Sequence, residues 1–252
     1  MTTRFDCGLD GVLLSSLNDR ICVLNIREEA PRMRTAALSL FPEGQRLLQH
    51  QRDKLTLHID FAIQQEDPVL RQEALLAVHA WARQGGVLTV PHRPGQRLTV
   101  VCAGLPAASA EDWTETLTLT FQSTRVPYWE AASKTSVNGV GELSLTIPGT
   151  GGLVPVDVLI FNAQEETFTS MTLRTGDTRM TFEGIDFYPG SLMVVHCSDP
   201  QEAVLNGDSI LSCLTADSDD LLLLPCGESA AVSVFSGETP MRATFAARGR
   251  FA

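Results

Sequence analysis

The clearest pattern in the sequence is an alternation of apolar and polar residues over residues 54–63. Because successive side chains of a strand point to opposite faces, this period of two predicts a β-strand. One face of the strand belongs to a core and the other face is wetter. The apolar set comprises Leu55, Leu57, Ile59, Phe61 and Ile63.

A helical pattern begins directly after this strand. Asp67 can cap the first turn, and Pro68 can take the first helical position, where its missing N–H costs nothing. The pattern ends at Gly85-Gly86. Small alanines would let this helix lie close to a sheet, while Trp81 supplies most of the buried area. The apolar residues at helical spacing are Leu70, Ala74, Ala77, Val78 and Trp81.

Three further strands are predicted after the helix. Residues 87–90 and 96–102 form a β-hairpin, because residues 91–95 between them are rich in turn formers. Residues 113–124 form a long strand with apolar residues on one face and threonines on the other. Such a row of threonines suits a sheet surface that meets water or a neighbouring subunit. The row comprises Thr114, Thr116, Thr118 and Thr120.

The character of the sequence changes between residues 126 and 139. Val126-Pro127-Tyr128-Trp129 is followed by a polar stretch over residues 133–138 that closes on Gly139, so we place a domain boundary here. Eight short strands separated by turn residues then predict a β-sandwich or jelly roll. We expect them at residues 142–147, 154–162, 167–174, 179–184, 192–197, 221–224, 231–235 and 241–251.

Composition indicates a folded protein with an acidic surface. The 252 residues are 44% hydrophobic and 19% charged, an ordinary globular range that leaves room for two domains. The formal net charge of −11 argues against a broad basic surface for nucleic-acid backbones. We expect the acidic residues to be spread along the chain, so that a channel wall built from it would repel DNA weakly.

The six cysteines indicate neither a metal site nor a redox motif. They are scattered, form no CxxC pair and have no histidine cluster nearby. The N-terminus has no signal-peptide pattern, and no apolar run approaches the roughly 20 residues that span a bilayer. We therefore expect reduced thiols, a cytoplasmic site of synthesis and no membrane insertion.

No arrangement of residues for catalysis stands out. The sequence has neither a GxSxG elbow nor a phosphate-binding glycine loop, and its five histidines do not cluster. Residues 217–220 are better explained as a solvated acidic turn than as a calcium loop, because Leu222 stands where such a loop needs glycine. A glycosidase would need two paired carboxylates, for which Glu142, Glu183 and Asp186 are candidates. Nothing in the sequence singles out one of them as a general acid. We predict no enzyme activity and no catalytic, cofactor-binding or metal-binding residues.

The order of elements in the first half resembles the distal tail (Dit) proteins of long-tailed bacteriophages. In that family an arginine near the helix start and a tryptophan near its end recur, and Arg71 and Trp81 stand at these places. Residues 117–121, running into Pro127-Tyr128-Trp129, are similar to the end of the family's ring domain.

The second half resembles the domain that these proteins carry outside the ring. The similarity lies in residues 180–184 and 221–228, although Cys226-Gly227 stands where a proline-glycine turn is more typical. The resemblance implies a mainly β fold. Residues 1–134 would form a β-sandwich-like ring domain with one α-helix and a β-hairpin, and residues 139–240 a jelly-roll or galectin-like β-sandwich. In some members the final strand, here within residues 241–252, returns to the ring domain.

The resemblance also implies a structural role in a virion tail. Six copies would form a ring at the distal end of the tail tube, after synthesis in the bacterial host cytoplasm. This ring would be the baseplate hub that connects the tube to the tail tip, and DNA would pass through its channel without specific binding. The expected partners are other copies of the chain, the tail tube protein, the tape measure protein, the tail-tip or tail-associated lysin protein and a receptor-binding protein. No cofactor is expected.

We predict that the hairpin of residues 87–101 contacts a neighbouring subunit. Unpaired strand edges are hazardous on a monomer but become useful when a neighbour pairs with them in a closed ring. The alternative is a self-contained hairpin, which is a common element. The expected interface residues are Val87, Leu88, Val90, Pro91, His92, Arg93, Arg97, Leu98 and Val100.

Two other functions remain open at this point. The C-terminal half could be a carbohydrate-binding module for host cell-surface glycans, although it contains no tryptophan and Tyr188 as its one tyrosine. A hydrolase with an unrecognised site is the third hypothesis, and it is the least favoured of the three.

Overall fold

The computed structural model describes residues 6–40, 44–107, 116–198 and 200–252, with the backbone alone for residues 34–40 and 44–51. The chain divides into two compact units, Met1–Trp129 and Glu130–Ala252. The short strand β10 (Trp129–Ala131) carries the chain from the first unit into the second. The polar stretch of residues 133–138 is therefore part of the second unit, and from Thr135 onwards it belongs to strand β11 (Thr135–Val140).

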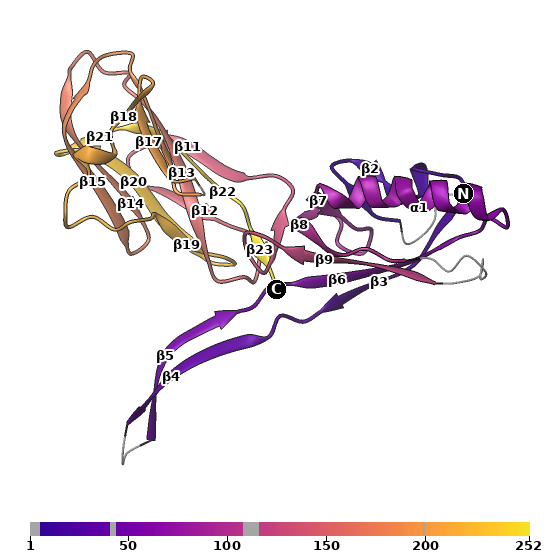
Figure 1. The fold of residues 1–252 in the computed structure, drawn as a ribbon. Helices are drawn as coiled ribbons and strands as arrows, with labels where there is room; N and C mark the ends of the chain where they lie inside the picture. The colour runs from indigo at the N-terminus through magenta and orange to yellow at the C-terminus, as the bar shows by residue number, and fades with distance from the viewer. Residues whose placement is uncertain (1–5, 41–43, 108–115, 199) are drawn as a thin grey trace. The chain divides into compact units, whose positions relative to one another are not determined.

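The first unit is built on one antiparallel sheet (Figure 1). Its strands lie in the order β2-β1-β7-β8-β9-β6-β3. The predicted strand at residues 54–63, the predicted hairpin and the described part of the predicted long strand are confirmed as β6, β7, β8 and β9; residues 113–115 lie outside the described residues. The bounds are β1 (Gly8–Leu9), β2 (Val12–Leu13), β3 (Ile21–Glu29), β6 (Thr56–Ile63), β7 (Gly86–Thr89), β8 (Gln96–Gly104) and β9 (Leu117–Ser123).

Helix α1 (Pro68–Arg83) packs on one face of this sheet. The Asp67 carboxylate accepts hydrogen bonds from the backbone N–H of Val69 (2.8 Å) and Leu70 (3.4 Å), which confirms the predicted cap. The Trp81 ring meets Phe121 of β9 edge-on, with ring centroids 6.1 Å apart. The first unit thus has two layers, the sheet and helix α1.

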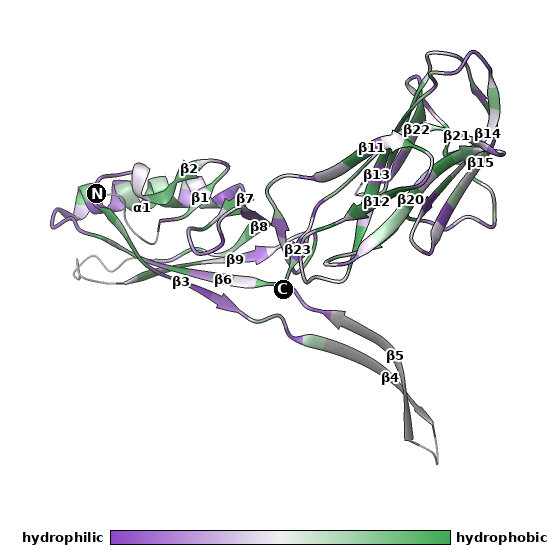
Figure 2. Ribbon diagram, turned by 180° about the vertical axis from the view of Figure 1, so that it is seen from behind, coloured by the Kyte–Doolittle hydropathy of each residue, from purple (hydrophilic) through white to green (hydrophobic). Residues whose placement is uncertain are grey.

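The buried stripe of α1 differs from the predicted one. Leu70 is 47% exposed, whereas Leu75, which the spacing argument left out, is buried. Arg71 also lies in the buried stripe, where it donates to the backbone carbonyl of Gln65 (3.4 Å). Hydrophilic and hydrophobic bands accordingly both occur along the helix in Figure 2. The buried helix residues are Arg71, Ala74, Leu75, Val78 and Ala82.

Between β3 and β6 the chain forms a second, two-stranded sheet from β4 (Met33–Leu40) and β5 (Gly44–Arg52). This hairpin continues from the ends of β3 and β6 as a separate ribbon (Figure 1). At its base the backbone N–H of Asp53 donates to the carbonyl of Arg32 (2.7 Å), and the Arg52 guanidinium lies 4.8 Å from the centre of the Tyr128 ring. The 3-10 turn η1 (Leu14–Ser16) packs against β3.

The second unit is a sandwich of two antiparallel sheets. The larger sheet has the order β11-β22-β13-β16-β17-β18, with β19 paired to β13, and the smaller has the order β12-β20-β14-β15, with β21 paired to β20. The bounds are β11 (Thr135–Val140), β12 (Leu143–Thr146), β13 (Leu153–Phe161), β14 (Phe168–Thr175), β15 (Thr178–Phe187), β16 (Leu192–His196), β17 (Glu202–Leu205), β18 (Asp208–Ser209), η2 (Leu211–Cys213), β19 (Leu223–Pro225), β20 (Ser229–Ser236), β21 (Thr239–Pro240), β22 (Arg242–Ala247) and β23 (Arg250–Phe251).

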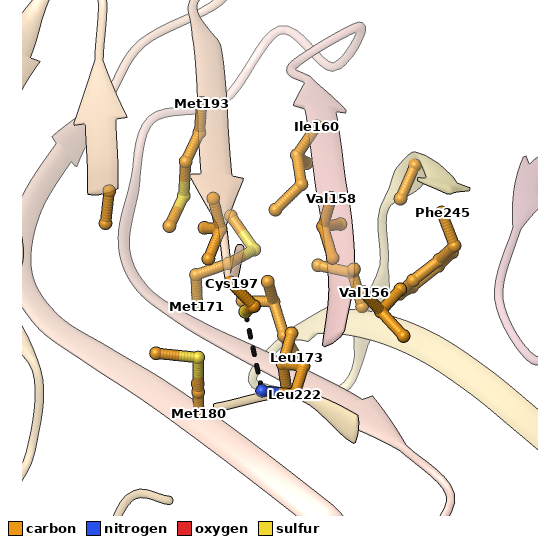
Figure 3. Packing of buried hydrophobic residues seen from close by; sticks show 14 of the residues in the cluster. Val156, Val158, Ile160, Met171, Leu173, Met180, Met193, Cys197, Leu222 and Phe245 are labelled. Carbon is orange, nitrogen blue, oxygen red and sulfur yellow. Dashed lines mark hydrogen bonds between the residues drawn. The ribbon is translucent and has the colours of Figure 1, made fainter. Parts of the chain in front are cut away.

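The core of the second unit lies between these two sheets. Val158 and Ile160 of β13 point from one side, and Met171 and Leu173 of β14 point from the other (Figure 3). The backbone N–H of Leu222 donates to the sulfur of a buried cysteine, Cys197 (3.4 Å). The mainly β fold predicted from the sequence is confirmed.

The predicted strand at residues 241–251 is two strands in the structure. Its first part, β22, pairs with both β11 and β13 inside the larger sheet of the second unit. β22 therefore completes the second unit's sandwich. The partner strand β11 lies in the polar stretch at which the sequence predicts a domain boundary.

Candidate assembly surfaces

The first unit's sheet has a polar face opposite the helix. Along β6 and β9 the odd-numbered residues are buried, whereas the even-numbered residues between them are half-exposed. Thr118 and Thr120 of the predicted threonine row lie on this face, whereas Thr116 is exposed just before β9 begins and Thr114 lies outside the described residues. The sheet is therefore covered on one side by α1 and open on the other, as the alternation predicts.

Hydrogen-bonded charge pairs occupy this open face. Arg27 of β3 donates from Nε and Nη2 to the two carboxylate oxygens of Asp60, both at 2.9 Å. The Thr118 hydroxyl donates to the same carboxylate (2.7 Å). The hydrogen bond from Arg27 is the main reason that the pKa of Asp60 is lowered, and Thr118 adds to the effect. Nearby, His58 Nδ1 lies 3.2 Å from the Thr120 hydroxyl.

Strand β3 is the end strand of this sheet. Within the described residues, its hydrogen-bonded neighbour is β6 alone. The pairing slips between Val23 and Asn25, which leaves Leu24 as the extra residue of a bulge. Leu24 is 43% exposed. An open edge strand that displays an apolar residue is a liability for a monomer and a natural contact for an assembly.

A compact cluster joins the end of β3 to the turn of the β7–β8 hairpin. Arg93 donates to both carboxylate oxygens of Glu28, from Nη2 (2.9 Å) and from Nε (3.1 Å). Trp129 Nε1 donates to the same carboxylate (3.3 Å), and His92 Nε2 lies 2.9 Å from it. The Arg93 guanidinium also lies 5.8 Å from the centre of the Trp129 ring. This cluster holds the hairpin turn against β3.

The charge of Glu28 is stabilised in the folded state. Burial alone would raise the pKa of Glu28, but the hydrogen bonds from Arg93 and His92, the charge of Arg93 and the bond from Trp129 outweigh burial and lower it.

The pH dependence of stability follows from this shift. Because the pKa of Glu28 is lower in the folded than in the unfolded protein, ionised Glu28 contributes stability above about pH 4.5, near the ordinary glutamate value. That contribution is lost as the pH falls towards the folded pKa. We expect urea midpoints of the protein to drop between pH 5 and pH 3. The Glu28→Gln variant should show a shallower drop, and an identical drop in both proteins would contradict this assignment.

The structure modifies the argument for the predicted interface hairpin. Strand β7 pairs with both β1 and β8, and β8 pairs with both β7 and β9, so the edges of this hairpin are already used within the chain. Its apolar residues Leu88, Val90, Leu98 and Val100 are buried in the first unit's core. Among the others, Pro91 and His92 are exposed and Val87, Arg93 and Arg97 are half-buried. A contact of these residues with a neighbour stays a prediction, but free edges do not support it.

The negative charge of the chain is concentrated in the second unit. Residues 130–252 contain 16 Asp and Glu against 6 Lys and Arg, whereas residues 1–129 contain 14 against 13. The acidic residues are spread over both units, as expected, whereas most of the basic residues lie in the first unit. The first unit is nearly neutral overall, while the second unit repels polyanions.

The acidic turn of residues 217–220 protects a strand edge. The backbone N–H of Asp219 donates to the carbonyl of Arg179 (2.8 Å), and the Asp219 carboxylate accepts from the Arg179 N–H (2.7 Å). The Ser218 hydroxyl accepts from the N–H of Thr181 (2.9 Å). Asp217 forms an ion pair with Arg179. This turn covers the start of the edge strand β15. That part of the edge of β15 is therefore protected, in contrast to the open edge of β3 in the first unit.

The side chains that could carry chemistry are the cysteines, the histidines and the acidic residues. All six cysteines are free thiols, and burial is the main cause that raises the pKa of Cys197 to about 11. In the part of the chain that the structure describes, no three His, Cys, Asp or Glu residues gather as metal ligands. None of the described helices is long and apolar enough to cross a membrane. Glu183 and Asp186 are exposed on β15, and Glu142 lies in the turn before β12.

Comparison with known proteins finds the same fold in a solved structure of a phage protein. No protein-family model matches the chain, and no curated protein matches it either. Among solved structures, the fold is that of a phage Dit protein. The match is to phage SPP1 Dit (gp 19.1), described as a paradigm of hub adsorption apparatus in phages that infect Gram-positive bacteria, with a TM-score of 0.76 and 13% identity over 98% of this chain and 99% of that chain.

The baseplate of phage p2 gives weaker matches. Its activated conformation with Sr matches with a TM-score of 0.48 and 8% identity, over 97% of each chain. The activated conformation with Ca matches with a TM-score of 0.47 and 9% identity, again over 97% of each chain. The SPP1 match covers both units of the chain and confirms the fold that the sequence resemblance implied.

Proposed function

We propose that this protein is a structural hub component of a phage tail, which assembles as a ring of six copies at the distal end of the tail tube. The observation that carries the proposal is the full-length similarity in fold to the SPP1 Dit protein. In this role the chain acts through its shape and its contacts, without catalysis. Its partners would be the tail tube, the tape measure, the tail-tip or tail-associated lysin and a receptor-binding protein.

The open edge of β3 supports assembly through the first unit. A closed ring removes an open edge by pairing or covering it with the next copy, in a contact that repeats around the axis. The hairpin β4–β5 supports the same conclusion, because an isolated two-stranded hairpin is at best marginally stable in water. We infer that the next copy covers both elements.

The open polar face of the first unit's sheet is our candidate for the channel wall. Its charges are paired, as in Arg27 and Asp60, and its threonines offer small neutral groups. A nearly neutral, hydroxyl-rich wall neither binds phosphates through clustered Lys and Arg nor repels them strongly. This face would let DNA pass without specific binding.

Light scattering tests the assembly and its edge together. We expect a mass near six times 27.4 kDa for the purified protein. The Leu24→Lys variant places a charge on the β3 edge, so it should weaken association about tenfold or more without changing the thermal midpoint of the dissociated protein. Val69→Lys is the matched control, because Val69 is an exposed apolar residue of α1. A mass that falls equally in both variants would contradict a role for β3.

The carbohydrate-binding alternative stays a prediction for the second unit. Its excess of acidic residues would repel polyanionic cell-wall polymers, so a glycan ligand would have to be uncharged. A glycan screen with the whole protein tests this, and uniformly absent binding would remove the alternative.

A further inference from the structure

The larger sheet of the second unit carries an exposed apolar patch. Leu159 and Phe161 lie on β13 beside the buried Ile160, whose side chain points into the core (Figure 3). Because strand residues alternate, Leu159 and Phe161 therefore point away from the core. The pairing of β13 with β16 sets Leu159 opposite Val194 and Phe161 opposite Leu192. We call these four residues the β13–β16 patch.

Three members of the patch are large apolar side chains that are exposed to solvent. Leu159, Phe161 and Leu192 are 42%, 44% and 42% exposed. The outward positions of the smaller sheet are instead mostly polar. A β-sandwich alone in water needs no apolar outer face, so a contiguous exposed patch marks a surface that something covers. The polar positions of the smaller sheet include Ser144, Thr146, Thr172, Arg174 and Thr181.

The chain next to the patch is held firmly in place. Asn162, which follows Phe161, is fully buried, and its amide donates to the carbonyls of Phe187 (2.8 Å) and Glu166 (2.9 Å). Its side-chain oxygen accepts from the N–H of Gln164 (2.9 Å). A surface that is already ordered loses less entropy when a partner binds.

The charge around the patch selects the kind of partner. Glu165 and Glu166 are exposed in the turn that follows β13, Asp208 is exposed on β18, and Glu202 is exposed on β17. Arg242, paired opposite Phe161, is the nearest basic residue by register. With 16 acidic against 6 basic residues in the unit, a complementary partner has apolar residues accompanied by Lys or Arg.

The hairpin β4–β5 has this composition. Residues 33–52 contain three arginines and one glutamate, together with two alanines and four leucines. In the described backbone, Ala37 is paired with Leu47 and Leu38 with Arg46. The hairpin forms a sheet of its own, so it needs a surface to stabilise it. The molecule thus carries both a basic, apolar hairpin and an acidic, apolar face.

We propose that the β13–β16 patch receives the β4–β5 hairpin of another copy of the chain. The proposal rests on the proposed self-assembly and assigns to the second unit a part in it. Apolar contacts with Phe161 at the centre provide affinity, and the opposite charges of the hairpin and the acidic unit set the pairing. Each copy in a ring would then hold the hairpin of the next.

Photo-crosslinking in the assembled protein tests this contact. The photoreactive residue p-benzoylphenylalanine replaces Phe161, and ¹⁴N protein is assembled with ¹⁵N protein in equal amounts. After irradiation and digestion, mass spectrometry should find position 161 joined to a peptide from residues 33–52 of the other isotope. The same label in place of Thr146, on the outer face of the smaller sheet, is the control and should give no such product.

The outcomes separate this inference from the proposed function. A protein that remains a monomer overturns both, whereas an assembled protein whose label joins other segments, or joins residues 33–52 within one isotope only, overturns this inference alone. A second measurement uses Phe161→Glu, which should weaken self-association about tenfold or more, with Thr146→Glu as control. Equal association of both variants would also overturn the inference.

Discussion

Replacing Phe121 with alanine is expected to lower the free energy of unfolding by about 4 kcal/mol. Phe121 is fully buried on β9 between β6 and β8, and its ring meets Trp81 of α1 edge-on at 6.1 Å. Alanine would leave a cavity where the helix and the sheet meet. Urea unfolding followed by circular dichroism measures the loss, which is a large fraction of the 5–15 kcal/mol that is typical of a domain.

The next residue on the same strand provides the control. Gln122 lies on the open face of the sheet, so Gln122→Ala should change the free energy of unfolding by less than about 0.5 kcal/mol in the dissociated protein. If Gln122→Ala were as costly as Phe121→Ala, the sheet would be covered on both faces. The assignment of an open face to the channel would then be wrong.

Replacing Glu28 with alanine is expected to cost about 2 to 3 kcal/mol. The change leaves the Arg93 guanidinium, whose side chain is 27% exposed, without its carboxylate partner, and it removes the acceptor for Trp129. Removing one partner of a fully buried ion pair costs about 3–5 kcal/mol, and the partial exposure here reduces that value. Urea unfolding of Glu28→Ala at pH 7 measures the effect.

A double-variant cycle tests whether these residues act as a unit. The combined variant Glu28→Ala, Arg93→Ala should cost less than the sum of the two single variants, because each removes the same interaction. Glu29→Ala, next in the chain and more exposed, should change stability by less than about 0.5 kcal/mol. Full additivity of the two single effects would contradict the proposed coupling.

Local patterns predicted the elements whose two faces differ in burial. Apolar and polar residues alternate strictly along strand β6. Helix α1 begins at an Asp-Pro pair, which is typical of a helix start. The stripe of α1 was placed incorrectly because Arg71, a charged residue with a long apolar stem, takes a buried position while Leu70 is exposed. Hydrophobicity alone does not indicate which side of a helix a sheet will cover.

One of the strands that were not predicted has little apolar character. The sequence of the edge strand β11 predicts a loop, because its residues are mostly too polar or too small for a core. They include Thr135, Ser136, Asn138 and Gly139. Its identity as a strand comes from pairing with β22, more than 100 residues away in sequence. Whether the β7–β8 hairpin has free edges also depends on residues far away in the sequence. Strand β1 pairs with β7 and strand β9 pairs with β8, so neither edge is free.

The two units would contribute different surfaces to the proposed hub. The first unit contributes an open edge, a polar face and a hairpin that lacks support within its own sheet. The second unit contributes an acidic sandwich with an apolar patch on its larger sheet. Among the residues that the structure describes, no three His, Cys, Asp or Glu side chains come together as metal ligands.

Electron microscopy of the purified protein tests the central claim most directly. The account predicts six-fold rings with a central hole, formed without any other tail protein. Class averages that contain only single two-lobed particles at high protein concentration would contradict it.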